Sequence, residues 1–240
     1  MARTVTEMFP RAGDPDVFPP SVSRYSATIP ALAVAVGHWA GVALPPALQR
    51  ATAKRRVQFL AGRHCARMAI EGVAPEALAD ALPQDPDGCP VWPVRLVGSI
   101  SHTDRFATAA VALRSEARGL GVDVEPVMSG EATAEIERLI ASNEETRRVR
   151  RAGDLAAAEA LTLVFSAKES LYKALYPATR QSFEYLDCEI VRLDPDERRF
   201  VIRIGAPFNV AMGRTEFEGG YELTGGEVRT GVVVPAVARA

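Results

Sequence analysis

The chain has 240 residues, of which 48% are hydrophobic and 24% are charged, as expected for a globular protein with a sizeable core. A formal net charge of −2 and a pI near 6.0 argue against a general nucleic-acid-binding protein, which is usually basic. No apolar run approaches the length of about 18 residues that spans a membrane. Residues 1–18 also lack the apolar region of a signal peptide.

The cysteines and histidines give no sign of a disulfide framework or a zinc centre. The chain has three of each, widely spaced and without a Cys-x-x-Cys pair. An odd number of scattered cysteines is typical of a reducing compartment. We therefore expect a cytoplasmic protein that neither binds nucleic acid nor crosses a membrane.

The first part of the chain predicts a lead-in, a strand and a helix. Residues 1–28 are rich in proline and polar residues and predict irregular structure. The apolar stretch 29–37 predicts a strand. A helix is predicted from Pro45-Pro46 to about Glu71, because proline is tolerated in the first helical turn.

This helix belongs to a basic segment. Residues 17–70 contain no Asp or Glu but seven Lys or Arg, which predicts a local surface that attracts anions. The alternative is an ordinary solvated basic face. Arg56 and Arg63 are seven positions apart and share a helix face, whereas Arg55 lies about 80° from Arg63.

A loop with several prolines, residues 75–93, is followed by a predicted hairpin. Residues 95–102 and 106–113 predict its strands, with a turn at 103–105. Ser101 and His102 end the first strand. They do not predict nucleophilic catalysis, because neighbours on a strand point to opposite faces and no Gly-x-Ser-x-Gly elbow is present. They suit an anion-binding site, although a structural role for the histidine stays open.

Residues 119–126 predict a strand that carries two acids. Val122 and Val124 alternate with Asp123 and Glu125, so both carboxylates should lie on one face. Like charges so close repel each other unless a cation lies between them. Oxygen ligands of this kind suit Mg²⁺, although a surface Asp-x-Glu is also common.

The last part predicts helices followed by a sheet. Residues 131–151 predict a charged, exposed helix, and Gly153 or Asp154 is expected to cap a second, long helix, with strand-like segments after Pro177. The strands predicted after it cover 183–193, 199–204, 214–223 and 228–234, with turns at 194–196 and 225–226. Each half of the chain thus offers a helix and antiparallel strands, which predicts an α/β (α+β) fold.

The long helix carries an unusual charged face. Phe165, Glu169 and Lys173 are spaced by four residues and share one face beside an apolar stripe. Among 28 Lys and Arg residues only three are lysines, Lys54, Lys168 and Lys173. Two lysines kept beside one glutamate indicate a chemical role, because lysine is a compact point charge and arginine a rigid fork. The alternative is an ordinary surface Glu–Lys pair.

These signals together predict a site for one Mg²⁺, a diphosphate and a separate phosphate. They also carry a resemblance. Residues 121–125 (Gly-Val-Asp-Val-Glu) and 165–173 (Phe-x-x-Lys-Glu-Ser-x-x-Lys) closely resemble the motifs of the 4′-phosphopantetheinyl transferase superfamily. Trp92-Pro93 and residues 98–102 match its upstream motif. Residues 59–67 resemble the adenine-nucleotide-binding helix of its Sfp-like branch, nearest the enterobactin-synthase component D type.

The resemblance implies transfer of phosphopantetheine from coenzyme A, the substrate, to a serine of an apo acyl or peptidyl carrier protein, releasing 3′,5′-ADP. Such carriers belong to polyketide, nonribosomal peptide or fatty-acid synthases, and siderophore pathways use them too. It also implies a monomer built as a single-chain pseudo-dimer. The two similar halves would be residues 1–116, with the nucleotide-binding helix, and 117–240, with the metal-binding and catalytic motifs.

The resemblance also implies roles for individual residues. Asp123, Glu125 and Glu169 would bind Mg²⁺, or Mn²⁺ as the alternative. Glu169 would accept the proton of the carrier serine, directly or through water. Lys173 would stabilise charge on the leaving group, with Lys168 as a weaker contributor.

Binding of the 3′-phosphate of coenzyme A and its neighbouring groups would fall to Arg55, Arg63, Ser101 and His102. Helical periodicity alone does not choose between Arg55 and Arg56, and the family pattern favours Arg55.

One departure from the family pattern concerns the loop before Trp92. Related sequences often have a Lys or Arg there, whereas this chain has Asp87-Gly88-Cys89, so Arg95 is a candidate substitute. Two other functions fit the acidic residues less well. A Mg²⁺-dependent phosphohydrolase or nuclease would usually need a wider basic track, and a degenerate coenzyme A-binding module would not need every acid and the lysine.

Overall fold

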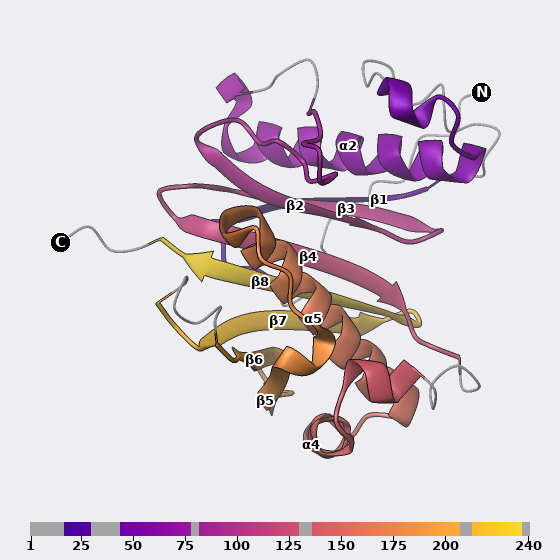
Figure 1. The fold of residues 1–240 in the computed structure, drawn as a ribbon, viewed down its shortest axis with the longest axis vertical. Coiled ribbons are helices and arrows are strands. Elements are labelled where there is room, and N and C mark those ends of the chain that lie inside the picture. The colour runs from indigo at the N-terminus through magenta and orange to yellow at the C-terminus, as the bar shows by residue number, and fades with distance from the viewer. Residues whose placement is uncertain (1–16, 30–43, 78–81, 130–135, 207–212, 237–240) are drawn as a thin grey trace.

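The computed structural model describes residues 17–29, 44–77, 82–129, 136–206 and 213–236, which form two antiparallel sheets, each with a helix packed on it (Figure 1). The first sheet has the order β1-β3-β2 and consists of β1 (Ser23–Thr28), β2 (Leu96–His102) and β3 (Phe106–Leu113). The second has the order β4-β8-β7-β6-β5 and consists of β4 (Ala117–Pro126), β5 (Cys188–Asp194), β6 (Arg199–Ile204), β7 (Glu216–Thr224) and β8 (Glu227–Pro235).

The helix α2 (Ala53–Val73) covers one face of the three-stranded sheet (Figure 1). The Oγ1 of Thr52 caps its first turn by accepting a hydrogen bond from the backbone N–H of Arg55. Gly62 lets the helix approach the sheet closely, because a Cβ there would lie 2.7 Å from the Cγ2 of Ile100. The core of this half includes the buried side chains of Leu60 and Val111.

The five-stranded sheet is covered by α5 (Ala157–Thr179), with α4 (Asn143–Gly153) at one end of it (Figure 1). The predicted apolar stripe of α5 is confirmed, since Leu161, Val164, Leu171 and Leu175 are all buried in the core of this half. Fully burying a leucine stabilises the fold by about 1.5–3 kcal/mol, so this stripe holds α5 firmly on the sheet.

The two sheets meet where β2 lies beside β4 (Figure 1). Ser99 Oγ accepts a hydrogen bond from the backbone N–H of Val122 at 3.1 Å, and Ser101 Oγ accepts one from the N–H of Val124 at 3.4 Å. Apolar side chains from both strands, such as Val97 and Val122, share a core cluster. The predicted α+β fold of antiparallel sheets and helices is confirmed.

The division into halves at 116/117 and their similarity as a pseudo-dimer stay predictions. All described strands of the first sheet precede residue 114, and those of the second follow residue 116. The two sheets differ in strand number, three against five.

Several predicted elements were wrong in the first half. Residues 23–28, expected to be irregular, form β1, because Tyr25 and Ala27 alternate into the core and the segment pairs with β3. The helix expected from Pro45 is divided into a short 3-10 helix (Pro46–Leu48) and α2, which begins after the Thr52 cap. Most of the strand expected at 29–37 lies outside the described residues.

The second half also differs in detail. The helix expected at 131–151 is interrupted, since residues 136–140 are helical and Ser142 caps a new helix, α4, with Glu145, Thr146 and Val149 buried. Asp154 ends α4 instead of capping α5, whose N-cap is Ala156. Pro177 lies inside α5, which continues to Thr179, and β5 begins five residues later than predicted, after a 3-10 helix (Tyr185–Asp187).

The hairpin of β2 and β3 and the strand β6 agree with the predicted ranges to within a residue. In the described part of the chain, no helix combines the length and apolar character needed to cross a membrane.

Candidate active site

Two glycines of β4 bring the backbone of α5 directly onto the strand. A Cβ at Gly121 would lie 1.8 Å from the carbonyl oxygen of Ser170, and one at Gly119 would lie 2.4 Å from that of Ala174. Only glycine fits at such distances. The next residues on this face of β4 are Asp123 and Glu125, so their carboxylates extend along α5.

Asp123 is buried and hydrogen-bonded at both carboxylate oxygens. Its Oδ1 accepts from Lys173 Nζ at 2.6 Å and from Ser101 Oγ at 2.9 Å, and its Oδ2 accepts from Ser166 Oγ at 2.8 Å. Lys173 Nζ also lies 3.2 Å from Ser101 Oγ. Residues from β2, β4 and α5 therefore meet at one carboxylate, and a buried charge of this kind needs such partners.

Glu125 lies in a region of excess negative charge. Burial, and then the charges of Asp123 and Glu169, raise the pKa of its carboxyl and Lys173 lowers it, with a net value of about 7. Asp123 and Glu125 interact with each other, as expected for carboxylates on one face of β4, and the charge of Glu169 also acts on Glu125. Among the residues that the structure describes, no three Asp, Glu, His or Cys side chains already surround a point where a metal ion could sit.

Glu169 has a tyrosine partner that sequence reasoning missed. The hydroxyl of Tyr185 donates a hydrogen bond to Glu169 Oε1, with 2.6 Å between the two oxygens. Burial, and then the Glu169 carboxylate, raise the pKa of Tyr185 well above its usual value, so it remains a donor at neutral pH. Tyr185 also lines a cavity of about 240 Å³ beside Glu169, together with Tyr172 and Phe183.

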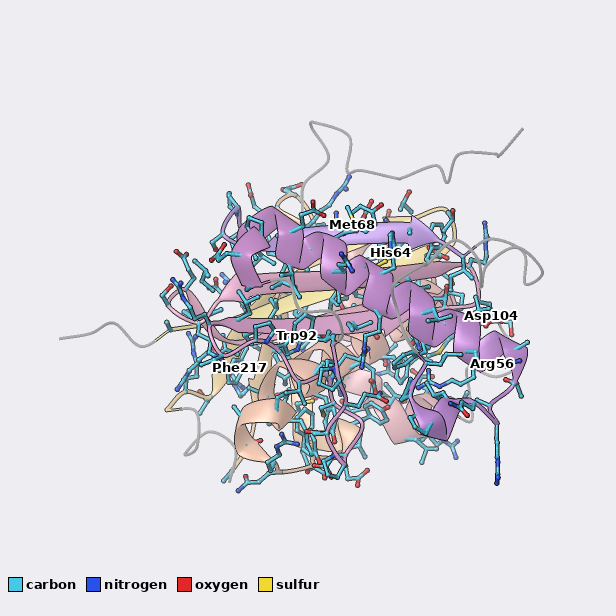
Figure 2. The ribbon with its side chains drawn as sticks, turned by 90° about the horizontal axis from the view of Figure 1, so that it is seen from above. Arg56, His64, Met68, Trp92, Asp104 and Phe217 are labelled. Atoms are coloured by element: carbon cyan, nitrogen blue, oxygen red, sulfur yellow. The ribbon has the colours of Figure 1, made fainter. Side chains whose placement is uncertain are left out.

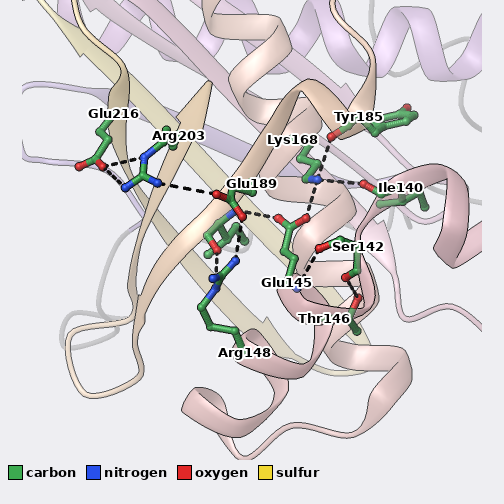
Figure 3. A network of polar contacts seen from close by, with 11 residues as sticks. Ile140, Ser142, Glu145, Thr146, Arg148, Lys168, Tyr185, Glu189, Arg203 and Glu216 are labelled. Atoms are coloured by element: carbon green, nitrogen blue, oxygen red, sulfur yellow. Dashed lines mark hydrogen bonds and ion pairs between the residues drawn. The ribbon is translucent and has the colours of Figure 1, made fainter. Parts of the chain in front are cut away.

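Lys168 lies inside the protein, in a network of polar contacts with Glu145, Ile140 and Tyr185 (Figure 3). Its side chain is fully buried, and its Nζ donates to Glu145 Oε2 at 2.8 Å, to the carbonyl oxygen of Ile140 at 2.9 Å and to that of Tyr185 at 2.8 Å. These three bonds use all three protons of the ammonium group. The structure thus gives Lys168 a structural environment at the wall of the cavity beside Glu169, and its contribution to leaving-group charge stays a prediction.

At the other edge of the site, Arg55 reaches the end of β2. Its Nη1 lies 3.0 Å from His102 Nε2. Arg63 is buried, donates from Nε to the carbonyl oxygen of Leu82 at 2.9 Å, and stacks over the ring of Phe59. Burial, and then the charge of Arg55, lower the pKa of Arg63 to about 10, so it is still charged at neutral pH.

Two nitrogens in this group have no hydrogen-bond partner among the residues that the structure describes. They are the buried Nη2 of Arg63 and Nδ1 of His102. Arg56 follows Arg55 on α2, and Figure 2 shows it near the end of the helix that lies beside Asp104. Of these two arginines, Arg55 is the one whose contact with His102 the structure shows, and its role in coenzyme binding stays a prediction.

The loop before Trp92 uses its acids for a different contact. Asp85 and Asp87 both bind Arg180 Nη1, at 2.6 Å and 3.0 Å, which ties the loop to the end of α5. Arg95 precedes the first residue of β2, whereas Ser101 and His102 end that strand. The role of Arg95 as a substitute for the basic residue missing from the loop stays a prediction.

Residues 44–112 match the model of the 4′-phosphopantetheinyl transferase N-terminal domain, and residues 119–224 match that of the 4′-phosphopantetheinyl transferase superfamily. The chain belongs to this superfamily. The match to the first model includes Arg55, Arg63, Ser101 and His102, and the match to the second includes every acid and lysine of the cluster.

Individual phosphopantetheinyl transferases support the assignment. The chain is 36% identical over 197 residues to 4′-phosphopantetheinyl transferase Svp of Streptomyces mobaraensis. This alignment covers 79% of this chain and 76% of the relative. The chain is 34% identical over 195 residues to PptT of Mycobacterium tuberculosis, covering 75% and 82%. Enterobactin synthase component D of Escherichia coli O157:H7 is 38% identical over 146 residues, covering 60% and 65%. The protein is thus an enzyme of the phosphopantetheinyl transferase class.

In this transferase the structure brings most predicted site residues together. Ser101, Asp123 and Lys173 are in direct contact, Glu125 and Glu169 adjoin them, and Arg55 and His102 form the neighbouring group. Besides Tyr185, sequence reasoning missed Ser166, which binds Asp123. Its spacing of seven from Lys173 places both on one helix face and could have revealed it.

His102 gives this transferase a predicted acid sensitivity. Burial lowers the pKa of His102 below its usual value, and the charges of Arg55 and Lys173 lower it further. The folded protein therefore keeps His102 neutral, while the unfolded chain takes up a proton below about pH 6.5, so stability falls as pH falls. When the pH is lowered from about 7.5 to 5.5, the melting temperature of His102→Asn should fall by less than that of the wild type. Equal losses in the two proteins would contradict this assignment.

Proposed function

We propose that this transferase moves the 4′-phosphopantetheine arm of coenzyme A onto a serine of an apo acyl or peptidyl carrier protein and releases 3′,5′-ADP, in a Mg²⁺-dependent reaction. The observation that carries the proposal is the cluster around Asp123, in which acids and a lysine lie beside a separate group of basic side chains. Coenzyme A has the matching charges, a diphosphate and a distant 3′-phosphate.

The side chains around Asp123 fit a hard divalent cation by their chemistry. Asp123, Glu125 and Glu169 offer only oxygen donors, which Mg²⁺ prefers, and Mn²⁺ accepts similar ligands. The pKa of Glu125 is raised first by burial and then by the charge of Asp123, which Lys173 only partly offsets. These three residues would hold the ion, which when bound would neutralise the diphosphate and its developing charge.

The chain's own groups have distinct tasks in this proposal. Glu169 takes the proton from the attacking serine hydroxyl, as a carboxylate general base. Lys173 remains charged beside Asp123 and offers its ammonium protons to the phosphate oxygen of the leaving group. The cavity beside Glu169 holds the apolar part of the pantetheine arm, which packs against the aromatic rings of Tyr172 and Phe183.

The nucleotide end of coenzyme A fits the basic group on α2 and β2. The unpartnered Nη2 of Arg63 and Nδ1 of His102 are unusual, because buried polar atoms are normally hydrogen-bonded. A phosphate would satisfy such donors, since charge-assisted hydrogen bonds to phosphate are among the strongest in proteins. Ser101 adds a hydroxyl on the same side as Lys173. We assign this group to the 3′-phosphate.

The reaction is tested by incubating the protein with coenzyme A, Mg²⁺ and a panel of apo carrier proteins from fatty-acid, polyketide and nonribosomal peptide synthases. The expected result is a carrier mass increase of one phosphopantetheine arm and stoichiometric 3′,5′-ADP. Both should be lost when the metal is removed by EDTA and restored by Mg²⁺. Hydrolysis of coenzyme A without carrier modification would contradict the proposal and favour a phosphohydrolase.

A pair of variants tests the assignment of the 3′-phosphate. Arg55→Ala should raise the Kd of coenzyme A by about 10- to 100-fold, because it removes a charged hydrogen-bond donor worth about 1.5–3 kcal/mol. The Kd of 3′-dephospho-coenzyme A should change little. Arg56→Ala is the matched control, with an expected change of less than about threefold for either ligand. Calorimetric titration measures all four values, and a larger effect at Arg56 would reverse the assignment.

A further inference from the structure

The hydroxyl of Tyr185 is the closest hydrogen-bond donor to Glu169 among the contacts of the described residues, at 2.6 Å from Oε1. A hydrogen bond to a charged group is shorter and stronger than one between neutral groups. It engages one carboxylate oxygen and leaves Oε2 for other partners. A carboxylate with one oxygen engaged in this way has a defined orientation, which a freely rotating glutamate lacks.

Tyr185 is itself held at its backbone. Its carbonyl oxygen accepts a hydrogen bond from Lys168 Nζ at 2.8 Å (Figure 3). The same ammonium is paired with Glu145, whose Oε1 accepts the backbone N–H of Ile190 at 2.6 Å. We call the buried pair of Lys168 and Glu145 the anchor of Tyr185. Its hydrogen bonds connect α4, α5 and β5 where Tyr185 begins its 3-10 helix.

The ring of Tyr185 is also fixed by packing. It lies against the ring of Phe165, with 5.5 Å between the centroids and 51° between the planes. Phe165 lies one helical turn before Glu169 on α5. The same face of the helix therefore contacts the ring of Tyr185, through Phe165, and its hydroxyl, through Glu169. The ring and the backbone of Tyr185 are therefore constrained independently, and its hydroxyl is left with little freedom.

We propose that Tyr185 is a positioning residue that holds Oε1 of Glu169, so that the second oxygen, Oε2, is directed at the reacting groups. This inference rests on the proposed function, in which Glu169 accepts the serine proton. Tyr185 forms no bond to substrate and gives up no proton. It acts through the orientation of Glu169, and the buried pair of Lys168 and Glu145 supports it from behind.

The kinetic test compares Tyr185→Phe with Tyr221→Phe, which removes the hydroxyl of a buried tyrosine on β7, outside the site. Tyr185→Phe should lower kcat about 10- to 100-fold with the KM for coenzyme A changed less than about threefold, because the hydrogen bond supports catalysis and not nucleotide binding. Tyr221→Phe should keep the wild-type kcat. A kcat for Tyr185→Phe within twofold of the wild type, or an effect on KM alone, would overturn the proposal.

A second measurement does not depend on activity. Urea unfolding of Tyr185→Phe, Glu169→Met and the double variant, without metal or coenzyme A, forms a double-mutant cycle. Tyr185→Phe should shift the unfolding midpoint in the wild-type background and leave it almost unchanged when Glu169 is already Met. Additive shifts would overturn the proposal by showing that the two side chains are independent. If the wild type fails to modify any carrier, the proposed function fails, while this cycle still reports on the contact.

Discussion

Replacing Glu169 by Gln is expected to lower kcat for carrier modification by about 10²- to 10⁴-fold, the usual range for loss of a general base. The amide cannot accept the serine proton, and it also removes a negative charge from the proposed cation site. The fold should persist, because the amide oxygen can still accept the hydrogen bond that Tyr185 donates to Glu169. Steady-state kinetics and the melting temperature measure the two effects.

The matched control is Glu144→Gln, which changes an exposed glutamate on α4. This variant should transfer at the wild-type rate, since surface substitutions of this kind usually have small effects. Near wild-type turnover by Glu169→Gln, with its melting temperature unchanged, would remove Glu169 from the mechanism.

The second large effect is expected on stability, at Lys168. Lys168→Met should lower the free energy of unfolding by about 3–5 kcal/mol, the typical effect of removing one partner from a buried ion pair. The change leaves the buried carboxylate of Glu145 without its cation and the carbonyl oxygens of Ile140 and Tyr185 without a donor. Urea unfolding monitored by circular dichroism gives the difference.

Two further variants separate burial from charge. Lys54→Met removes a lysine of the exposed pair with Asp104, whose side chains are 57% and 66% exposed, and should change the free energy of unfolding by at most about 1 kcal/mol. Glu145→Gln combined with Lys168→Met should recover part of the loss, because no buried charge is then left alone. If Lys168→Met destabilises the protein no more than Lys54→Met, the buried pair is not the anchor described above.

The difference between Glu169 and Lys168 shows what can be predicted from sequence. Local periodicity was enough to predict that the two acids of β4 share a face and that Glu169 and Lys173 share a face of α5. Both predictions depend only on spacing along one element. The environment of Lys168 depends on Glu145 and Tyr185, which lie 23 and 17 positions away in the chain. One signal was available: Lys168 lies four residues after Val164 and three before Leu171, on the buried stripe of α5, whereas Lys173 lies on the face of Glu169.

Tyr185 was missed for a related reason. Residues 183–193 were predicted as one strand, in which a tyrosine is an ordinary surface or core residue. The 3-10 helix that precedes β5 changes the direction of its side chain, and that helix is stabilised by tertiary contacts such as the bond from Lys168. Short elements of this kind carry too little local signal to be predicted.

The serines that join β2 to β4 have a consequence for how the coenzyme enters. Ser99 and Ser101 bond to backbone N–H groups of the neighbouring strand, so opening the molecule between its sheets would break buried hydrogen bonds and expose apolar surface. We therefore expect the proposed binding surface to be preformed and rigid, without a closing motion of the two sheets around the ligand. In the proposed reaction, little ordering entropy is lost when coenzyme A docks there, and the carrier serine meets a diphosphate that is already positioned for attack.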